Sequence, residues 1–177
     1  MRITFQKANT DEWHTPSWAV VPLMKYIPRN TTVWCPFDKF DSAFVQVLGA
    51  NGIHVVYSHI DNGEDFFTMK VPECDYIVSN PPYSRRDDVL RRLFEIGKPF
   101  VMLLSSLGIG EGKRWEMFSK NGVQFLIPNR RVNYHNGEIQ NKSAAFQSWY
   151  VCHKFLPRDI IFEQFSKCQL KEGNGND

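Results

Sequence analysis

The chain has 177 residues, of which 42% are hydrophobic and 23% are charged, and its formal net charge at pH 7 is +2. This length predicts a single domain, residues 1–177, that is large enough to form an ordinary hydrophobic core. The small net charge excludes a strongly basic nucleic-acid-binding protein, so any contact with phosphates must come from local clusters of arginine and lysine.

The cysteines and histidines are dispersed along the chain, and no C-x-x-C pair occurs. Since the start of the chain lacks an apolar signal region and no segment is long enough to span a membrane, we expect a cytoplasmic protein with free thiols. Cys152 and His153 are adjacent, which would place them on opposite faces of a strand. We therefore expect no metal site.

The predicted elements begin with an irregular segment, residues 1–12, followed by a helix. Thr15-Pro16 indicates the start of this helix, with Thr15 as its cap. Pro22 either kinks the helix or marks its true beginning, and the helix ends near Ile27. Farther along, apolar spacing predicts helices over 40–48, 84–96 and 114–118, and Ser84-x-x-Asp87 reads as a capping box for the second of these.

Apolar segments that fit strands alternate with these helices. They are residues 31–35, 53–57, 76–78, 100–104, 123–127 and 146–155. The segment 100–104 is continuously apolar, which is typical of a parallel strand covered on both faces. The polar, Gly/Asn-rich tail, residues 170–177, is expected to be disordered.

Alternation of strands and helices predicts an α/β fold with a doubly wound, mostly parallel sheet. In such sheets ligands bind at the carboxyl ends of the strands. We therefore expect one edge of the sheet to gather the residues that follow the strands: Pro36, Phe37, Asp38, His59, Asp65, Asn80 and Tyr83.

The segment Asn80-Pro81-Pro82-Tyr83 is the most informative part of the sequence, because it follows directly on an apolar strand. Each proline lacks an N–H group and fixes φ, and a residue before proline is pushed toward extended geometry. The carbonyl and amide oxygens of this segment would thus accept hydrogen bonds from a planar amino group, while Tyr83 stacks on the ring that carries it. The alternative is an ordinary surface turn.

This arrangement resembles the S-adenosylmethionine-dependent amino-methyltransferases, and specifically the small, phage-type DNA adenine-N6 methyltransferases. Their (D/N/S)-P-P-(Y/F/W) motif matches Asn80-Pro81-Pro82-Tyr83 residue for residue. Their aromatic residue followed by Thr-Pro looks like Trp13-His14-Thr15-Pro16, and their Asp-Phe pair looks like Asp65-Phe66. The resemblance extends over residues 13–155.

The resemblance implies a Rossmann-like class I methyltransferase fold with a C-terminal antiparallel strand pair. It also implies adenine-specific DNA methylation of a flipped base, with S-adenosyl-L-methionine as cofactor and DNA as partner. The catalytic residues would be Asn80, Pro81, Pro82 and Tyr83. The cofactor would be bound by Trp13, Thr15, Pro16, Pro36, Phe37, Asp38, His59, Asp65, Phe66 and Asn80.

The sequence departs from the family pattern after the first and second predicted strands. The family's Asp-Pro-Phe-x-Gly-x-Gly motif is replaced by residues 35–42, where Lys39 and Asp41 stand at the glycine positions. Where the family has an acid that binds the ribose, this chain has His59, with Asp61 two residues on. We expect the cofactor to bind less tightly than in glycine-bearing relatives, with Asp38 contacting the methionine amino group.

Residues 128–145 form the candidate target-contacting loop, which is polar and basic. Together with Arg85, its residues Arg130, Arg131 and Lys142 are the candidate nucleic-acid contacts. The alternatives are an ordinary hairpin loop and solvated charged faces. Because this loop is the one candidate reading element outside the predicted core, we expect weak or relaxed sequence specificity.

Other functions remain open at this stage. Protein glutamine methyltransferases share the Asn-Pro-Pro-Tyr motif, because a side-chain amide presents the same planar NH2 group. A degenerate methyltransferase fold that only binds nucleic acid or protein is the non-enzymatic alternative, suggested by the lost glycines. The segment 108–112 is glycine-rich, but its spacing is not G-x-G-x-x-G, so we interpret it as a flexible loop rather than a dinucleotide fingerprint.

Overall fold

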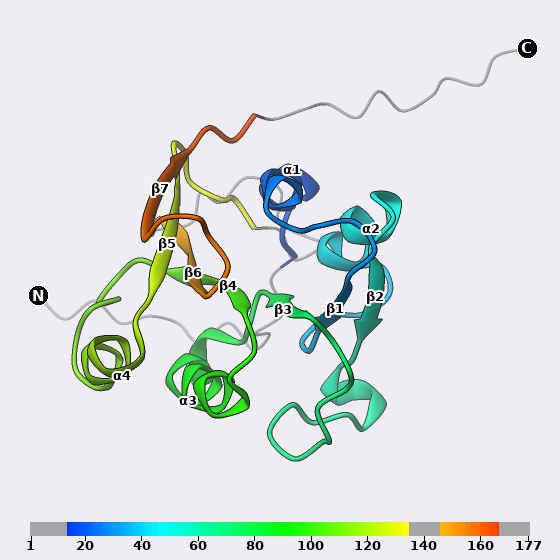
Figure 1. Ribbon diagram of the computed structural model, residues 1–177, viewed down its shortest axis with the longest axis horizontal. Helices are drawn as coiled ribbons and strands as arrows, with labels where there is room; N and C mark the ends of the chain where they lie inside the picture. Colours follow the sequence, from blue (N-terminus) through cyan, green and yellow to red (C-terminus); the bar gives the residue numbers. More distant parts are fainter. Residues whose placement is uncertain (1–13, 135–145, 167–177) are drawn as a thin grey trace, which may run out of the picture.

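The computed structural model describes residues 14–134 and 146–166 (Figure 1). Trp13, Lys142, the segment 1–12, the tail 170–177 and the second half of the candidate loop 128–145 lie outside this part of the chain. Within it, no helix is long and apolar enough to cross a bilayer.

A seven-stranded sheet forms the centre of the molecule, in the order β2-β1-β3-β4-β6-β5-β7. Its strands are β1 (Thr32–Cys35), β2 (His54–Tyr57), β3 (Tyr76–Ser79), β4 (Phe100–Ser105), β5 (Gln124–Pro128), β6 (Ser148–His153) and β7 (Ile160–Glu163). β1 to β4 pair in parallel, as do β5 and β7, whereas β6 is antiparallel to both of its neighbours. The predicted α/β class is confirmed, with a mostly parallel sheet and antiparallel pairing near the C-terminus.

Helices cover both faces of this sheet (Figure 1). One face carries α1 (Ser17–Val20), the 3-10 turn η1 (Val21–Lys25) and α2 (Ala43–Ala50), and the other carries α3 (Arg86–Ile96) and α4 (Lys113–Asn121). The central strand β4 is buried along its whole length. Val101 and Leu103 belong to the hydrophobic core under α1 and α2, and Phe100, Met102 and Leu104 belong to the core under α3 and α4. Burial on both faces explains why the sequence of β4 is continuously apolar, as predicted.

Two of the predicted helix caps were wrong. The N-cap of α1 is Pro16 and makes no side-chain cap bond, so Thr15 does not cap the helix. The capping box is also absent, because the short 3-10 turn η3 (Tyr83–Arg85) leads directly into α3, whose N-cap is Arg85. Packing of the motif against the sheet, rather than a local cap, determines where α3 begins.

The predicted start of α2, residue 40, lies three residues too early. α2 begins at Ala43, where the side chain of Ser42 accepts a hydrogen bond from the Val45 amide at 3.3 Å. The change from α to 3-10 geometry next to Pro22 confirms the predicted interruption, and Gly97 ends α3 with φ of 73°, as expected for a left-handed C-cap.

β7 was not predicted. Ile160, Ile161 and Phe162 are all apolar, so the sequence shows no alternation, yet the strand exposes Ile160 and Phe162. Besides its pairing with β5, β7 is held by contacts of its last residue. Glu163 accepts a hydrogen bond from the Tyr26 hydroxyl at 2.9 Å and forms an ion pair with Lys25. These bonds join the outer strand to the first helical segment.

Candidate functional site

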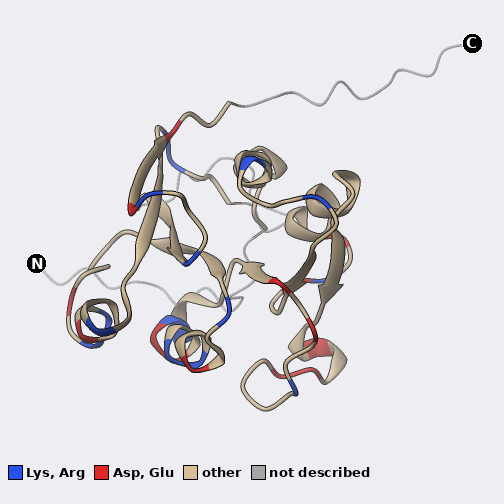
Figure 2. Ribbon diagram, in the orientation of Figure 1, with Lys and Arg blue, Asp and Glu red and all other residues tan. Residues whose placement is uncertain are grey.

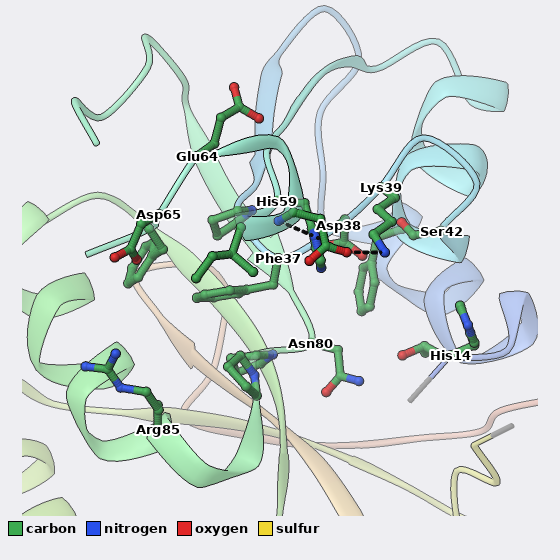
Figure 3. Close-up of a pocket in the computed structure, with 18 of the residues that line it drawn as sticks. His14, Phe37, Asp38, Lys39, Ser42, His59, Glu64, Asp65, Asn80 and Arg85 are labelled. Carbon is green, nitrogen blue, oxygen red and sulfur yellow. Dashed lines mark hydrogen bonds and ion pairs between the residues drawn. The ribbon is translucent and has the colours of Figure 1, made fainter. Parts of the chain in front are cut away.

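A cavity of about 360 Å³ opens at the carboxyl ends of β1, β2 and β3 (Figure 3). This volume lies in the usual range of small-molecule sites. Its wall includes all the residues that the sequence assigned to this edge: Pro36, Phe37, Asp38, His59, Asp65, Asn80 and Tyr83. Thr15, Phe66, Pro81, Pro82 and Arg85 also line it, whereas Pro16 does not.

Asp38 is a buried carboxylate in the cavity wall, with 6% of its surface exposed. Its Oδ2 accepts a hydrogen bond from the hydroxyl of Ser79, and Ser42 provides a second hydroxyl. Burial raises the pKa of Asp38 to about 6, against the opposing effect of these hydroxyls. These bonds hold the carboxylate between β3 and the start of α2, an arrangement that the sequence did not reveal.

Thr15 lies in the wall on the side of His14, and 8% of its surface is exposed. Among the described residues its hydroxyl has no hydrogen-bond partner. A buried hydroxyl without a partner costs free energy. A ligand atom that bonds to Thr15 would remove this cost, so the hydroxyl is a candidate ligand contact.

Asn80 follows the last residue of β3 and lines the cavity on the side opposite Lys39 and Glu64 (Figure 3). Pro81 is buried behind it, and Pro82 leads into η3. Because neither proline has an N–H group, this corner of the wall lacks two backbone donors. It suits a ligand that donates hydrogen bonds.

Tyr83 is held between two aromatic rings. Its ring meets Tyr134 edge to face at 6.1 Å and Phe146 at 5.5 Å, both between ring centroids. Tyr134 in turn donates a hydrogen bond to Ser148 at 2.7 Å. Burial raises the pKa of Tyr83. Tyr134 and Phe146 flank the interval 135–145, so the described residues on either side of this interval lie against the tyrosine of the motif.

The aromatic residue predicted to pack on an adenine ring, Phe66, lies mostly in the core. Only 2% of its surface is exposed, and its ring contacts Trp34, Phe37 and Phe67. Phe37 and Phe67 are half-buried and also line the cavity, so they are the more accessible rings. Asp65 holds this turn, since its Oδ1 accepts a hydrogen bond from the Phe67 amide at 2.9 Å.

Arg85 lies at the edge of the cavity, with its guanidinium 3.9 Å from the centre of the Phe67 ring. Arg130 and Arg131 are exposed and follow the carboxyl end of β5. All three arginines therefore lie toward the same edge of the sheet as the cavity. Elsewhere the charges are mixed, as Figure 2 shows for α3 and α4.

The charge in the cavity is mainly negative. Its wall contains five carboxylates and two permanent cations: Asp38, Asp41, Asp61, Glu64 and Asp65, against Lys39 and Arg85. Such a surplus attracts a cationic ligand and repels a polyphosphate. Among the described residues, no three His, Cys, Asp or Glu side chains are grouped so as to hold a metal ion.

Sequence reasoning missed several residues of the wall. Ser42, which lines the cavity, and Ser79, which lies behind the wall and bonds to Asp38, were not predicted. Ser79 is a polar residue that ends an otherwise apolar strand, and this signal could have identified it. Lys39 was noted as a substitute for glycine, but not as a side chain that reaches Asp61, with 2.6 Å between Nζ and Oδ2. Phe67 and Glu64 carried no signal of their own.

No protein-family model matches the sequence, and no curated protein matches it significantly. Solved structures that match this chain include two methyltransferase-related proteins, at low identity. One is the methyltransferase subunit of a type I restriction-modification system from Streptococcus thermophilus, with a TM-score of 0.46, 10% identity and coverage of 86% of this chain and 47% of that chain. The other is TrmN from Thermus thermophilus, with a TM-score of 0.35, 12% identity and coverage of 77% of this chain and 47% of that chain. This chain spans about half the length of either protein.

Proposed function

We propose that the protein is an S-adenosylmethionine-dependent methyltransferase that acts on the exocyclic N6 amino group of adenine in DNA. The main support for this proposal is that three chemically distinct groups border one cavity. The acceptor-rich segment Asn80-Pro81-Pro82-Tyr83 borders the same cavity as the buried carboxylate of Asp38 and the buried hydroxyl of Thr15.

The residues of the cavity fit this cofactor. Asp38 would accept a hydrogen bond from its ammonium group, and the Thr15 hydroxyl, which lacks a partner among the described residues, would donate to its carboxylate. The negative wall favours a sulfonium ion over a nucleotide with phosphates. When bound, the cofactor supplies an activated methyl group on sulfur.

The nucleoside end of the cofactor would lie near the turn that follows β2. Asp65 would accept from the adenine amino group, and Phe37 and Phe67 offer more accessible rings than Phe66. His59 and Asp61, which line the same side of the cavity, would lie beside the ribose. This assignment keeps the predicted adenine contact at Asp65 and moves the ring contact from Phe66 to its neighbours.

The target amino group would donate its N–H bonds to the side-chain oxygen of Asn80 and the carbonyl oxygen of Pro81. An exocyclic adenine nitrogen is a poor nucleophile because its lone pair is delocalised into the ring. Acceptors fixed at this position stabilise the positive charge that develops on the nitrogen during transfer. Because the methyl group is already activated, alignment completes the task without a general base that deprotonates the nitrogen first.

Inside a duplex the amino group is out of reach for in-line attack, so the base must be flipped out of the stack. Tyr83 would stack on the flipped base, supported by the edge contacts from Tyr134 and Phe146. Arg85, Arg130 and Arg131 at the same edge of the sheet support a polyanionic target.

Methyl transfer from labelled S-adenosylmethionine tests the proposal directly. The purified protein is incubated with duplex and single-stranded DNA that contain adenine, with the same DNA in which adenine is replaced by 7-deazaadenine or by purine lacking the amino group, and with a glutamine-containing peptide. We expect label in N6-methyladenine and none in DNA that lacks the amino group. Label in the peptide alone would indicate a glutamine methyltransferase, and no cofactor binding at millimolar concentration would indicate a non-enzymatic binding protein.

A further inference from the structure

Two loops that line the cavity are joined by a charged side-chain contact at its mouth. The loop after β1 contributes Lys39, and the 3-10 turn η2 (Ile60–Asn62) after β2 contributes Asp61. Their Nζ and Oδ2 atoms are 2.6 Å apart. The same loops are joined at their base by a backbone bond from the Asp38 amide to the Ser58 carbonyl, at 3.2 Å. Lys39 therefore adds a second, outer connection.

The contacts of Asp61 leave part of its carboxylate available to a ligand. Both of its side-chain contacts with described residues, to Lys39 and to His59, use Oδ2. A carboxylate accepts at both oxygens, so Oδ1 retains its capacity to accept. The Asp61 amide donates to Nδ1 of His59 at 3.2 Å, so a neutral His59 carries its proton on Nε2. The mouth thus presents an acceptor and a donor close together.

This combination suits a neutral hydroxylated group. A phosphate would be repelled by Asp61, Glu64 and Asp65, which all line this side of the cavity. A simple cation gains little at Asp61, because Lys39 already neutralises that carboxylate. A sugar hydroxyl donates to a carboxylate oxygen and accepts from an imidazole N–H, so it uses both groups at once.

We infer that Lys39 is a positioning residue that holds Asp61 to receive the ribose hydroxyls of the cofactor. This inference rests on the proposed function. At the place where the resembling family has glycine, the chain gains a side chain that orients the ribose acceptor from the opposite loop. The Lys39–Asp61 pair then makes the nucleoside end selective for ribose over deoxyribose.

Calorimetric titration with S-adenosylhomocysteine and with its 2′-deoxy and 3′-deoxy analogues tests this inference. In the wild type, loss of the recognised hydroxyl should weaken binding about tenfold, the scale of a hydrogen bond to a charged group. Asp61→Asn and Lys39→Met should both reduce the ratio of the dissociation constants of the deoxy analogue and S-adenosylhomocysteine toward one. The double variant should show the same ratio as either single variant. Lys113→Met, which changes an exposed lysine on α4, is the control and should keep the wild-type ratio.

The outcomes separate the inference from the function. A wild type that binds none of these ligands contradicts both. Binding of S-adenosylhomocysteine with a ratio that Lys39→Met leaves unchanged overturns the positioning role and leaves the function intact, since a purely structural lysine would weaken all ligands alike. If the preference for the ribose hydroxyl is lost in Glu64→Gln but persists in Asp61→Asn, the positioning role of Lys39 is also overturned.

Discussion

At the scale of single residues, Asp38 shows how burial changes the titration of a carboxyl group. Its pKa of about 6 lies above the ordinary value of 3.8, because the charged form is desolvated. In the free protein its contribution to folding stability is therefore complete below about pH 3.8 and is lost as the pH rises through 6. A cationic ligand reverses this penalty, since it stabilises the charged form.

Cofactor binding should consequently depend on pH. We expect the affinity for S-adenosylhomocysteine to rise roughly tenfold between pH 5 and pH 7, as Asp38 loses its proton, and then to level off. Asp38→Asn should bind more weakly and show a flat profile over this range. Calorimetry at several pH values measures both. An Asp38→Asn variant with the wild-type slope would assign the titration to another group.

Asn80→Ala should abolish methylation while leaving folding and most cofactor affinity intact. The amide oxygen acts on the reacting nitrogen, so its loss appears in turnover, by about a hundredfold or more. Single-turnover assays and cofactor titration measure the two effects separately. Asn121→Ala, at the exposed end of α4, serves as control. Near-wild-type turnover by Asn80→Ala would refute the assigned chemistry.

Tyr83→Ala should weaken binding of target DNA more than Tyr83→Phe or Tyr83→Trp. Stacking on a flipped base needs an aromatic face and is worth about 1–3 kcal/mol per base. Phenylalanine also preserves the edge contacts with Tyr134 and Phe146. Fluorescence titration with DNA that carries 2-aminopurine at the target measures this. Equal damage from Phe and Ala would indicate that the hydroxyl has a role of its own.

Part of the site was predictable at this scale, because a motif encodes its own local geometry. The prolines of Asn80-Pro81-Pro82-Tyr83 constrain φ wherever they occur, so the corner they form could be deduced. The partners of Asp38 could not, since Ser79 lies 41 residues away and reaches Asp38 only through the sheet. The burial of Phe66 was equally inaccessible, because three other aromatic rings decide it.

At the scale of elements, the bonds of Glu163 explain how the outer strand β7 stays in place. Although burial raises the pKa of Glu163, the hydrogen bonds from Lys25 and Tyr26 outweigh this effect and lower it. Its contribution to stability is present above the ordinary glutamate pKa and is lost as the pH falls through the lowered value. The same contact, together with burial, raises the pKa of Tyr26 to about 12.

Tyr26→Phe should therefore destabilise the protein by about 1.5 kcal/mol at pH 7, because it removes a hydrogen bond to a partly buried carboxylate. Urea denaturation at pH 7 measures the change in the free energy of unfolding. Tyr57→Phe, on the exposed edge strand β2, is the control and should be nearly neutral. If both variants unfold at the same urea concentration as the wild type, the bond to Glu163 makes no net contribution.

Strands were easier to predict than helix starts. Buried parallel strands such as β4 show continuous apolar sequence, whereas β7 is half-exposed and carries no readable period. The beginning of α3 depends on how the proline segment packs, which a local capping pattern such as Ser84-x-x-Asp87 does not reveal. Tertiary packing overrode the local signal there.

At the scale of the whole molecule, the sheet buries the cysteines that the structure describes. Cys35, Cys74 and Cys152 are all free and buried, and burial raises their pKa values. We expect these thiols to react with a maleimide only as fast as the protein opens, and to react rapidly in urea. Cys168→Ser, whose position lies outside the described residues, removes the remaining thiol as control. Rapid native labelling of Cys35 or Cys152 would contradict this core.

The strand order was the feature of the whole molecule that the sequence could not supply. Alternation predicts a parallel sheet, but the insertion of β6 between β4 and β5 depends on long-range pairing, from Phe100 with His153 to Ser105 with Ser148. It is this order that brings Tyr134 and Phe146 to Tyr83. The sequence therefore predicted the residues at the carboxyl ends of the strands better than the contacts of Tyr134 and Phe146 with Tyr83.

The hairpin formed by β5 and β6 also makes part of the molecule exchangeable. Gln147 closes its base, donating from Nε2 to the Pro128 carbonyl at 3.0 Å and accepting at its own carbonyl from the Ser106 amide at 2.8 Å. This closure fixes the end of β5 next to the start of β6. Val132 and Tyr134 are buried and Tyr134 packs on Tyr83, so these two residues belong to the core and the cavity wall and not to the exchangeable part. If the proposed function holds, replacing residues 135–145 between Tyr134 and Phe146 should change which DNA is selected while these contacts stay in place, a modular route to new specificities.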